Sequence, residues 1–354
     1  MSLLQQTLDR IRPQDAHARA QAQARLDQLI MPHWALGRLM DLAMDLAGMT
    51  ASVRPPVARK TIVTMAGDHG VAAEGVSKYP QDVTPQMVMG FVAGKAGINA
   101  LGRLVGATVV VADLGVAADL GELARAGKII DKKVALGTGN IAKGPAMTPA
   151  QAQRSIEAGI EIAQDLAGRT DVFGTGDMGI ANTTPSTAIL AVLTGTPVPD
   201  ITGRGTGIDD ATLAHKVAVV QRAIQVNQPN PTDPLDVLAK VGGFEIGGIA
   251  GLILGAAALR KPVVVDGFIS TAGAMLACAL APTAGEYIIA AHRSVEQGHR
   301  FMHSHLGKTP LLDLDLRLGE GTGAALAMTL VEAAARILTE IATFAEAHVS
   351  KADK

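Results

Sequence analysis

Short apolar runs alternate with glycine turns and helical stretches from about residue 56 to residue 315, and this alternation constrains the fold most. The runs that predict strands are residues 61–65, 108–112, 171–173, 263–265 and 287–290, with weaker candidates at 129–134 and 311–314. Apolar runs without polar alternation suit strands that are buried on both faces of a sheet. Strands that alternate with helices predict an α/β fold with a mostly parallel sheet flanked by helices.

The two ends of the chain have a different pattern. Residues 1 to about 50 place apolar side chains at helical spacing, and Pro55 and Pro56 follow as a linker. Residues 323–348 form an alanine-rich stretch that predicts a long helix or a helix pair. We expect both ends to pack together, so that 1–54 and 323–354 form a small helical domain beside an α/β domain at 55–322.

Charge, cysteine content and apolar segments exclude several classes of protein. The net charge is −2, no run of like charges is present and aromatic residues make up 3%, which argues against nucleic-acid binding. The lone Cys278 excludes an internal disulfide and a cysteine-based zinc site. The N-terminus has no apolar signal core, and the longest apolar run, 246–259, is shorter than the ~20 residues of a membrane span. These features predict a soluble cytoplasmic protein.

Gly174, Gly176 and Gly179 match the G-x-G-x-x-G pattern and follow a predicted strand. A dinucleotide site would also need an acidic residue at the end of the next strand, ~20 positions on. The candidate, Asp200, lies beside two prolines, which makes a poor strand end. Binding of one phosphate by main-chain N–H groups, with Asn182 near the following helix start, is a second interpretation. Tight packing of the strand on a helix is the third.

Glu320 lies between Gly319 and Gly321, so its carboxylate is sterically open to a ligand. Apolar surroundings would raise its pKa, which suits a general base. The alternative is a glutamate that only stabilises a helix N-terminus. Tyr79, Gln86 and Met87 follow the first strand and could line a pocket for a flat aromatic ligand, or belong to an ordinary loop and core helix.

The candidate metal ligands are incomplete. His299 and His303 share a helical face but lack an obvious third ligand, so we expect solvated histidines. Asp313 and Asp315 could hold Mg²⁺ but suit a solvated strand edge better. Asp209 and Asp210 are expected to begin a helix over 211–224. We therefore expect no metal.

Five stretches together resemble one family, the nicotinate-nucleotide–dimethylbenzimidazole phosphoribosyltransferases of cobalamin lower-ligand assembly. They are GDHGVAAEGVSKYPQDVTPQMV at 67–88, GDMGIANTTPS at 176–186, GRGTGIDD at 203–210, VVVDGFISTAGA at 263–274 and LRLGEGTGAALA at 316–327. The resemblance implies a Rossmann-like α/β domain, a small helical domain from both termini, and a homodimer. It also implies transfer of the 5-phosphoribosyl group of nicotinate mononucleotide to 5,6-dimethylbenzimidazole, which yields α-ribazole 5′-phosphate and nicotinate.

The resemblance also implies roles for individual residues. Glu320 matches the general base, and Asp177 stands where the family more often has a glutamate, so its carboxylate is one methylene shorter. The residues that match the nucleotide and phosphate site are Gly174, Thr175, Gly176, Gly179, Asn182, Gly203, Gly205 and Lys216. The residues that match the benzimidazole pocket are Ser77, Tyr79, Gln86 and Met87.

The implied reaction needs no cofactor, because the pyridinium of the donor is already a good leaving group. A carboxylate can take the proton that the acceptor ring loses as it attacks. Two other classes stay open. One is an NAD-dependent dehydrogenase, which rests on the glycine motif alone. The other is a nucleotide-sensing protein in which Glu320 has no catalytic role.

Overall fold

The computed structural model describes residues 1–350 and contains a six-stranded, all-parallel sheet in the order β3-β2-β1-β4-β5-β6. The strands are β1 (Lys60–Gly67), β2 (Ala107–Gly115), β3 (Ile130–Asp131), β4 (Val172–Met178), β5 (Val263–Val265) and β6 (Ile288–Ala290). The predicted α/β class and the five main strands are confirmed. The weaker candidate at 311–314 is wrong, since Leu312 makes only an isolated bridge to His292.

The centre of the sheet is β1, which is buried along its whole length and pairs with both β2 and β4. Lys60 is in register with Ala107 on one side and Val172 on the other. The strand order reverses between β1 and β4. In open α/β sheets, ligands bind outside the carboxyl ends of the strands at such a reversal.

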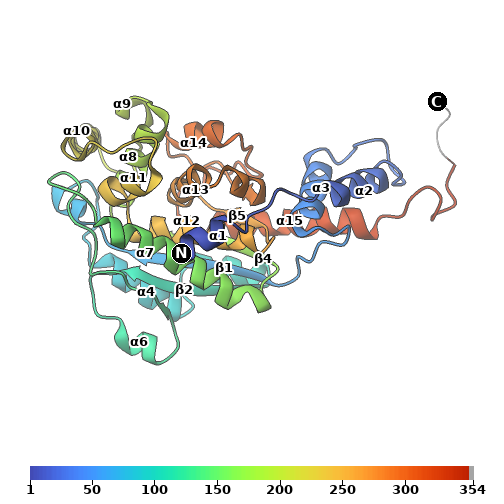
Figure 1. Cartoon of the computed structure of the whole chain (residues 1–354), viewed down its shortest axis with the longest axis horizontal. Helices are drawn as coiled ribbons and strands as arrows, with labels where there is room; N and C mark the ends of the chain where they lie inside the picture. The colour runs from blue at the N-terminus through green and yellow to red at the C-terminus, as the bar shows by residue number, and fades with distance from the viewer. Residues whose placement is uncertain (351–354) are drawn as a thin grey trace.

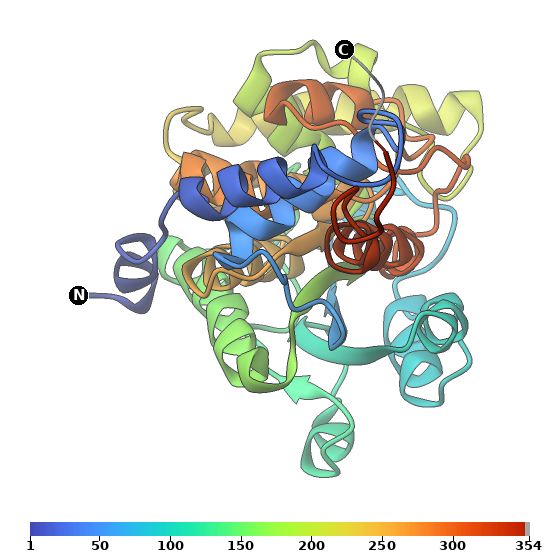
Figure 2. The same cartoon turned by 90° about the vertical axis from the view of Figure 1, so that its right-hand side faces the viewer.

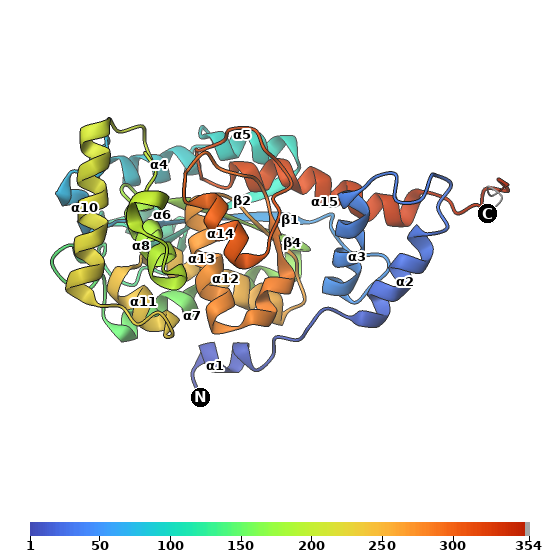
Figure 3. The same ribbon diagram turned by 90° about the horizontal axis from the view of Figure 1, so that it is seen from above.

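Helices cover both faces of the sheet (Figure 3). One face carries α7 (Pro149–Leu166), α12 (Phe244–Ala258) and α13 (Phe268–Leu280). The other carries α4 (Val83–Val92), α5 (Gly97–Leu104) and the first part of α15 (Thr322–Glu340). Glycines allow α7 and α12 to meet backbone to backbone, because a Cβ on Gly251 would lie 1.9 Å from the Ile156 carbonyl oxygen.

Further helices surround the carboxyl edge of the sheet (Figure 1). They are α8 (Thr183–Thr194), α9 (Val198–Ile201), α10 (Asp210–Asn227), α11 (Pro234–Val241) and α14 (His299–Leu306), while α6 (Gly121–Arg125) lies beside β3. Three 3₁₀ turns complete the set: Gly70–Glu74, Ala167–Arg169 and Pro282–Tyr287. The predicted helix start at Asp209 and Asp210 is confirmed, since the Asp209 side chain accepts from the Thr212 N–H at 2.8 Å.

The predicted contact between the chain ends is confirmed. Helix α3 (Arg38–Thr50) packs on α2 (Ala16–Leu26) and on α15 (Figures 1 and 2). By contrast, α1 (Leu3–Leu8) lies on α7 and α12, where the Leu4 N–H donates to Glu157. The domain boundaries at 54 and 323 stay a prediction, because the first part of α15 also contacts the sheet.

Helix α15 is the one helix in residues 1–350 that is long and apolar enough to cross a membrane. In that stretch, 61% of the residues are buried inside the protein. A core helix that joins a sheet to neighbouring helices has the same length and composition, so this observation is weak evidence for a span.

Candidate functional site

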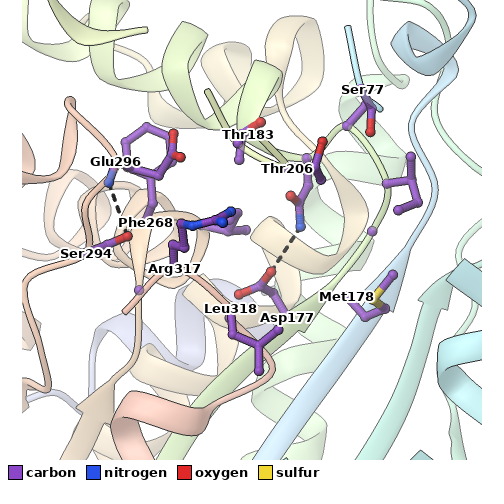
Figure 4. Close-up of a pocket in the computed structure, with 18 of the residues that line it drawn as sticks. Ser77, Asp177, Met178, Thr183, Thr206, Phe268, Ser294, Glu296, Arg317 and Leu318 are labelled. Carbon is purple, nitrogen blue, oxygen red and sulfur yellow. Dashed lines mark hydrogen bonds between the residues drawn. The ribbon is translucent and has the colours of Figure 1, made fainter. Parts of the chain in front are cut away.

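A cavity of about 320 Å³ lies at the carboxyl edge of the sheet, where β4, β5 and β6 end (Figure 4). Several of the predicted site residues line it: Ser77, Tyr79, Asp177, Gly179, Asn182 and Gly205. Gly203 lines an adjoining cavity that shares Gly205, Glu296 and Arg317 with the first. The reversal of strand order between β1 and β4 thus gathers side chains from distant parts of the sequence.

Two helices begin at this cavity. Asn182 and Thr183 open α8, and Gly267 and Phe268 open α13, and all four residues line the cavity. Within residues 1–350, no N-cap side chain accepts a hydrogen bond from the first N–H groups of either helix. At α8 the Thr184 N–H already donates to the Ala181 carbonyl and Pro185 has no N–H, so it is mainly the positive ends of the two helix dipoles that favour an anion at this point.

Lys216 reaches this region from α10 and is almost fully buried. Its Nζ donates to the Thr183 hydroxyl at 2.8 Å and to the Gly203 carbonyl at 3.1 Å. Burial lowers the pKa of Lys216 to about 8, although the nearby Glu296 raises it in part. Lys216 therefore supplies a positive charge directly behind the cavity wall that Thr183 forms.

The first two glycines of the motif lie inside β4 rather than after the strand. Gly174, Thr175 and Gly176 lie inside β4, and a Cβ on Gly176 would lie 2.2 Å from the Glu320 carbonyl oxygen. These glycines allow a neighbouring loop and α15 to approach the strand, which is the tight-packing interpretation. Asp200 is exposed in α9 and does not end a strand, so the dinucleotide interpretation lacks its acidic residue.

Asp177 is the penultimate residue of β4 and directs its carboxylate into the cavity (Figure 4). Its Oδ2 accepts from the Asn182 amide at 3.0 Å, while Oδ1 has no hydrogen-bond partner within residues 1–350. The side chain is 5% exposed. Burial, followed by the charges of Asp266 and Glu245, raises the pKa of Asp177 well above its ordinary value.

Glu320 lies next to Asp177 but faces another way. Its N–H donates to the Asp177 carbonyl at 3.3 Å, and its Oε2 accepts from the Ile98 N–H at 3.1 Å, at the start of α5. The preceding residues Leu318 and Gly319 line the cavity, whereas the Glu320 side chain is 5% exposed and does not. Burial raises the pKa of Glu320, as the sequence analysis expects for a general base.

The predicted benzimidazole residues divide into two groups. Ser77 and Tyr79 line the cavity. Gln86 and Met87 belong to α4 and do not line it, and Gln86 is exposed. The structure therefore brings only half of this predicted pocket to the main cavity.

The loop after β6 contributes residues that the sequence analysis does not name: His292, Ser294 and Glu296. Glu296 is 8% exposed, and a Cβ on Gly203 would lie 2.0 Å from its Oε2, which explains the glycine at 203. The sequence signal that could have identified these residues is their position directly after the predicted strand at 287–290. Arg317 and Phe268 also line the cavity (Figure 4).

The expectation of solvated histidines is wrong. His299 and His303 are buried, with ring centroids 4.1 Å apart, and His299 contacts the Thr271 hydroxyl at 2.9 Å. Burial lowers the pKa of His303 to about 4. Asp313 pairs with Arg293 at the surface. Within residues 1–350, no group of three or more His, Cys, Asp or Glu side chains is arranged to hold a metal ion.

The fold and the cavity define a class: a Rossmann-like α/β protein that can bind a phosphorylated ligand at the reversal of its strand order. A family model described as "Phosphoribosyltransferase" matches residues 11–349. Nicotinate-nucleotide–dimethylbenzimidazole phosphoribosyltransferases from Syntrophotalea carbinolica and Geobacter metallireducens are 64% and 57% identical to this chain, over 99% of both chains in each case. The crystal structure of such an enzyme from Thermus thermophilus superimposes with a TM-score of 0.90 at 45% identity, covering 96% of this chain and 100% of that one. The chain belongs to the nicotinate-nucleotide–dimethylbenzimidazole phosphoribosyltransferase family, which confirms the resemblance found in its sequence.

Proposed function

We propose that this protein transfers the 5-phosphoribosyl group of nicotinate mononucleotide to 5,6-dimethylbenzimidazole, in assembly of the cobalamin nucleotide loop. The observation that carries the proposal is the convergence of two helix N-termini and a buried carboxylate, Asp177, on one cavity in a member of this family. The products are α-ribazole 5′-phosphate and nicotinate, with inversion at the anomeric carbon.

The donor phosphate binds at the starts of α8 and α13, with the Lys216 charge behind Thr183. This set differs from the one expected from the glycine motif, because Gly174 and Gly176 are covered by protein. The positive ends of two helix dipoles and a buried ammonium suit a monophosphate and need no divalent cation. The ribose then lies toward Asp177, whose free Oδ1 can accept from a hydroxyl.

Glu320 is the proposed general base. As the acceptor nitrogen attacks the anomeric carbon, the bond to the nicotinate ring breaks, and the acceptor ring loses its other N–H proton to a carboxylate. In this structure the Glu320 carboxylate accepts a hydrogen bond from the Ile98 N–H, so it must rotate toward the cavity to take that proton. A raised pKa favours proton transfer near neutral pH.

Release of nicotinate tests the proposal. We expect nicotinate to appear only when nicotinate mononucleotide and 5,6-dimethylbenzimidazole are both present, and we expect the rate to survive exhaustive treatment with EDTA. Activity that is lost with EDTA and restored by Mg²⁺ or Zn²⁺ would contradict the metal-free mechanism. Binding of the donor without any nicotinate release would favour a nucleotide sensor, and hydride transfer to NAD would favour a dehydrogenase.

We further propose a cytoplasmic homodimer with its active sites near the subunit interface. Tyr79 and Leu318 both line the cavity and are 52% and 59% exposed, which leaves large apolar side chains at its mouth. Exposed apolar side chains around a binding site are typical of surfaces that another protein covers. A second copy of the chain would shield the acceptor from water.

A further inference from the structure

We propose that Asp266, directly after β5, is a positioning residue that fixes the backbone of the loop that carries Glu320. The inference rests on the proposed function, because it assigns Glu320 the role of general base. Asp266 is fully buried and does not line the main cavity, so it acts through Glu320 rather than on the substrate.

The Asp266 carboxylate bonds to the main chain on the C-terminal side of Glu320. Its Oδ2 accepts from the Gly321 N–H at 3.0 Å, and its Oδ1 accepts from the Ala324 N–H at 2.9 Å. The Asp266 N–H in turn donates to the Thr175 hydroxyl at 3.0 Å. Asp266 thus ties the first turn of α15 to the middle of β4 and the end of β5.

Glu320 needs such a restraint because its backbone conformation is unfavourable. Gly319, Glu320 and Gly321 have φ angles of +80°, +64° and +101°, and glutamate rarely adopts such values. Thr64 holds the same peptide from the sheet, with its hydroxyl donating to the Glu320 carbonyl at 2.8 Å. Thr64 and Asp266 therefore hold the C=O and the N–H of one peptide group, the one that follows Glu320.

Asp266 also sets the electrostatic environment of the loop. The ionisable groups that face this region are Asp177, Glu245, His292 and Glu320, with the His292 Nε2 3.7 Å from the Asp266 Oδ1. Burial is the main cause that raises the pKa of Glu320, and the negative charge of Asp266 raises it further. Hydrogen bonds from the start of α5 lower it. Removing that charge should therefore make Glu320 a weaker base.

The test compares Asp266→Asn with Asp171→Asn. Asp171 is also a buried carboxylate, but it pairs with Arg59 at the opposite, amino end of β4. Wild-type turnover of nicotinate mononucleotide is established first, so that failure of the proposed function is seen separately.

For Asp266→Asn we expect kcat to fall by ~10- to 100-fold, as it does when catalytic groups are misplaced. We also expect the acidic limb of the kcat–pH profile to move to lower pH. The donor KM should stay within about twofold, since the phosphate site is separate. Asp171→Asn should leave the pH profile unchanged.

An unchanged pH profile in Asp266→Asn would overturn the proposal and leave Asp266 as a simple helix cap. Thr64→Val tests the positioning through the carbonyl of the same peptide and does not depend on the folding of Asp266 variants. It removes one hydrogen bond and no charge, so kcat should fall while the acidic limb stays in place. Full kcat in Thr64→Val would contradict the idea that the loop must be held.

Discussion

At the scale of single residues, the carboxylates of Asp177 and Glu320 are both buried but have different partners. Asp177 accepts from a side-chain amide in the cavity, whereas Glu320 accepts from the start of α5. We predict that Glu320→Gln lowers kcat by ~10²–10⁴, the usual contribution of a positioned acid–base group. That loss corresponds to about 3–5 kcal/mol of transition-state stabilisation. Steady-state release of nicotinate measures it.

Asp177→Asn is the matched control, since Asp177 is the competing candidate for the base. Donor affinity should change little in Glu320→Gln, because the proposed phosphate site lies at α8 and α13. If Glu320→Gln keeps nearly full kcat while Asp177→Asn loses it, the wrong carboxylate has been assigned as the base.

Lys216 gives a prediction for alkaline pH. Its pKa is lowered to about 8, so its positive charge is complete below that pH and is lost as the pH rises through it. The donor phosphate is already a dianion there. We therefore expect kcat/KM for nicotinate mononucleotide to decline above pH ~8, since this parameter reports groups of the free enzyme. In Lys216→Gln, kcat/KM should be low and lack this decline. A wild-type profile that is flat up to pH 10 would exclude the role.

Residue patterns predicted Glu320 but missed Glu296. Glycines on both sides of a carboxylate are visible in the sequence, but the structure buries the Glu320 carboxylate against α5 instead of leaving it open to a ligand. Glu296 can be recognised as a site residue only in the structure, because the loop after β6 lies against Gly203 and Lys216 in space. Such a meeting of distant loops follows from strand order, which local patterns do not encode.

At the scale of elements, the contact between α7 and α12 depends on glycine. We predict that Gly251→Ala lowers the free energy of unfolding by about 1–3 kcal/mol, the usual cost of overpacking a core, because the new methyl would overlap the Ile156 carbonyl. Urea unfolding measures the change.

Gly90→Ala is the control for this prediction. Gly90 is also in a helix, α4, but a Cβ there meets nothing within 4 Å. Alanine should stabilise that helix by about 0.5–1 kcal/mol. Equal losses in both variants would show that helix propensity, rather than contact between backbones, governs Gly251.

The strands were predictable as elements, but the end of β4 was not. Local preference treats Gly174 and Gly176 as a turn, since glycine weakens a strand. In the structure β4 continues to Met178, because α15 and the loop of Glu320 fill the space that side chains would occupy. Tertiary packing therefore decided where this strand ended.

At the scale of the whole molecule, the exposed apolar mouth of the cavity predicts association. We expect light scattering to give a mass of about twice the 36.4 kDa of one chain. Replacing Leu318 with a charged residue should weaken the dimer and raise KM for the acceptor. A fully active monomer at assay concentrations would refute an interface that the active site requires.

Helix α15 begins one residue after Gly321 and ends against α3, so a single rod connects the base to the far end of the molecule (Figures 1 and 3). Its 19 residues span about 28 Å at 1.5 Å per residue. The peptide of Glu320 lies at the proximal end of this rod, so a rigid-body tilt of α15 would move it. A displacement of ~3 Å at its distal end would tilt it by ~6° at the catalytic end, by the same geometry. A force that displaces α2 and α3 would therefore change the orientation of the Glu320 carboxylate.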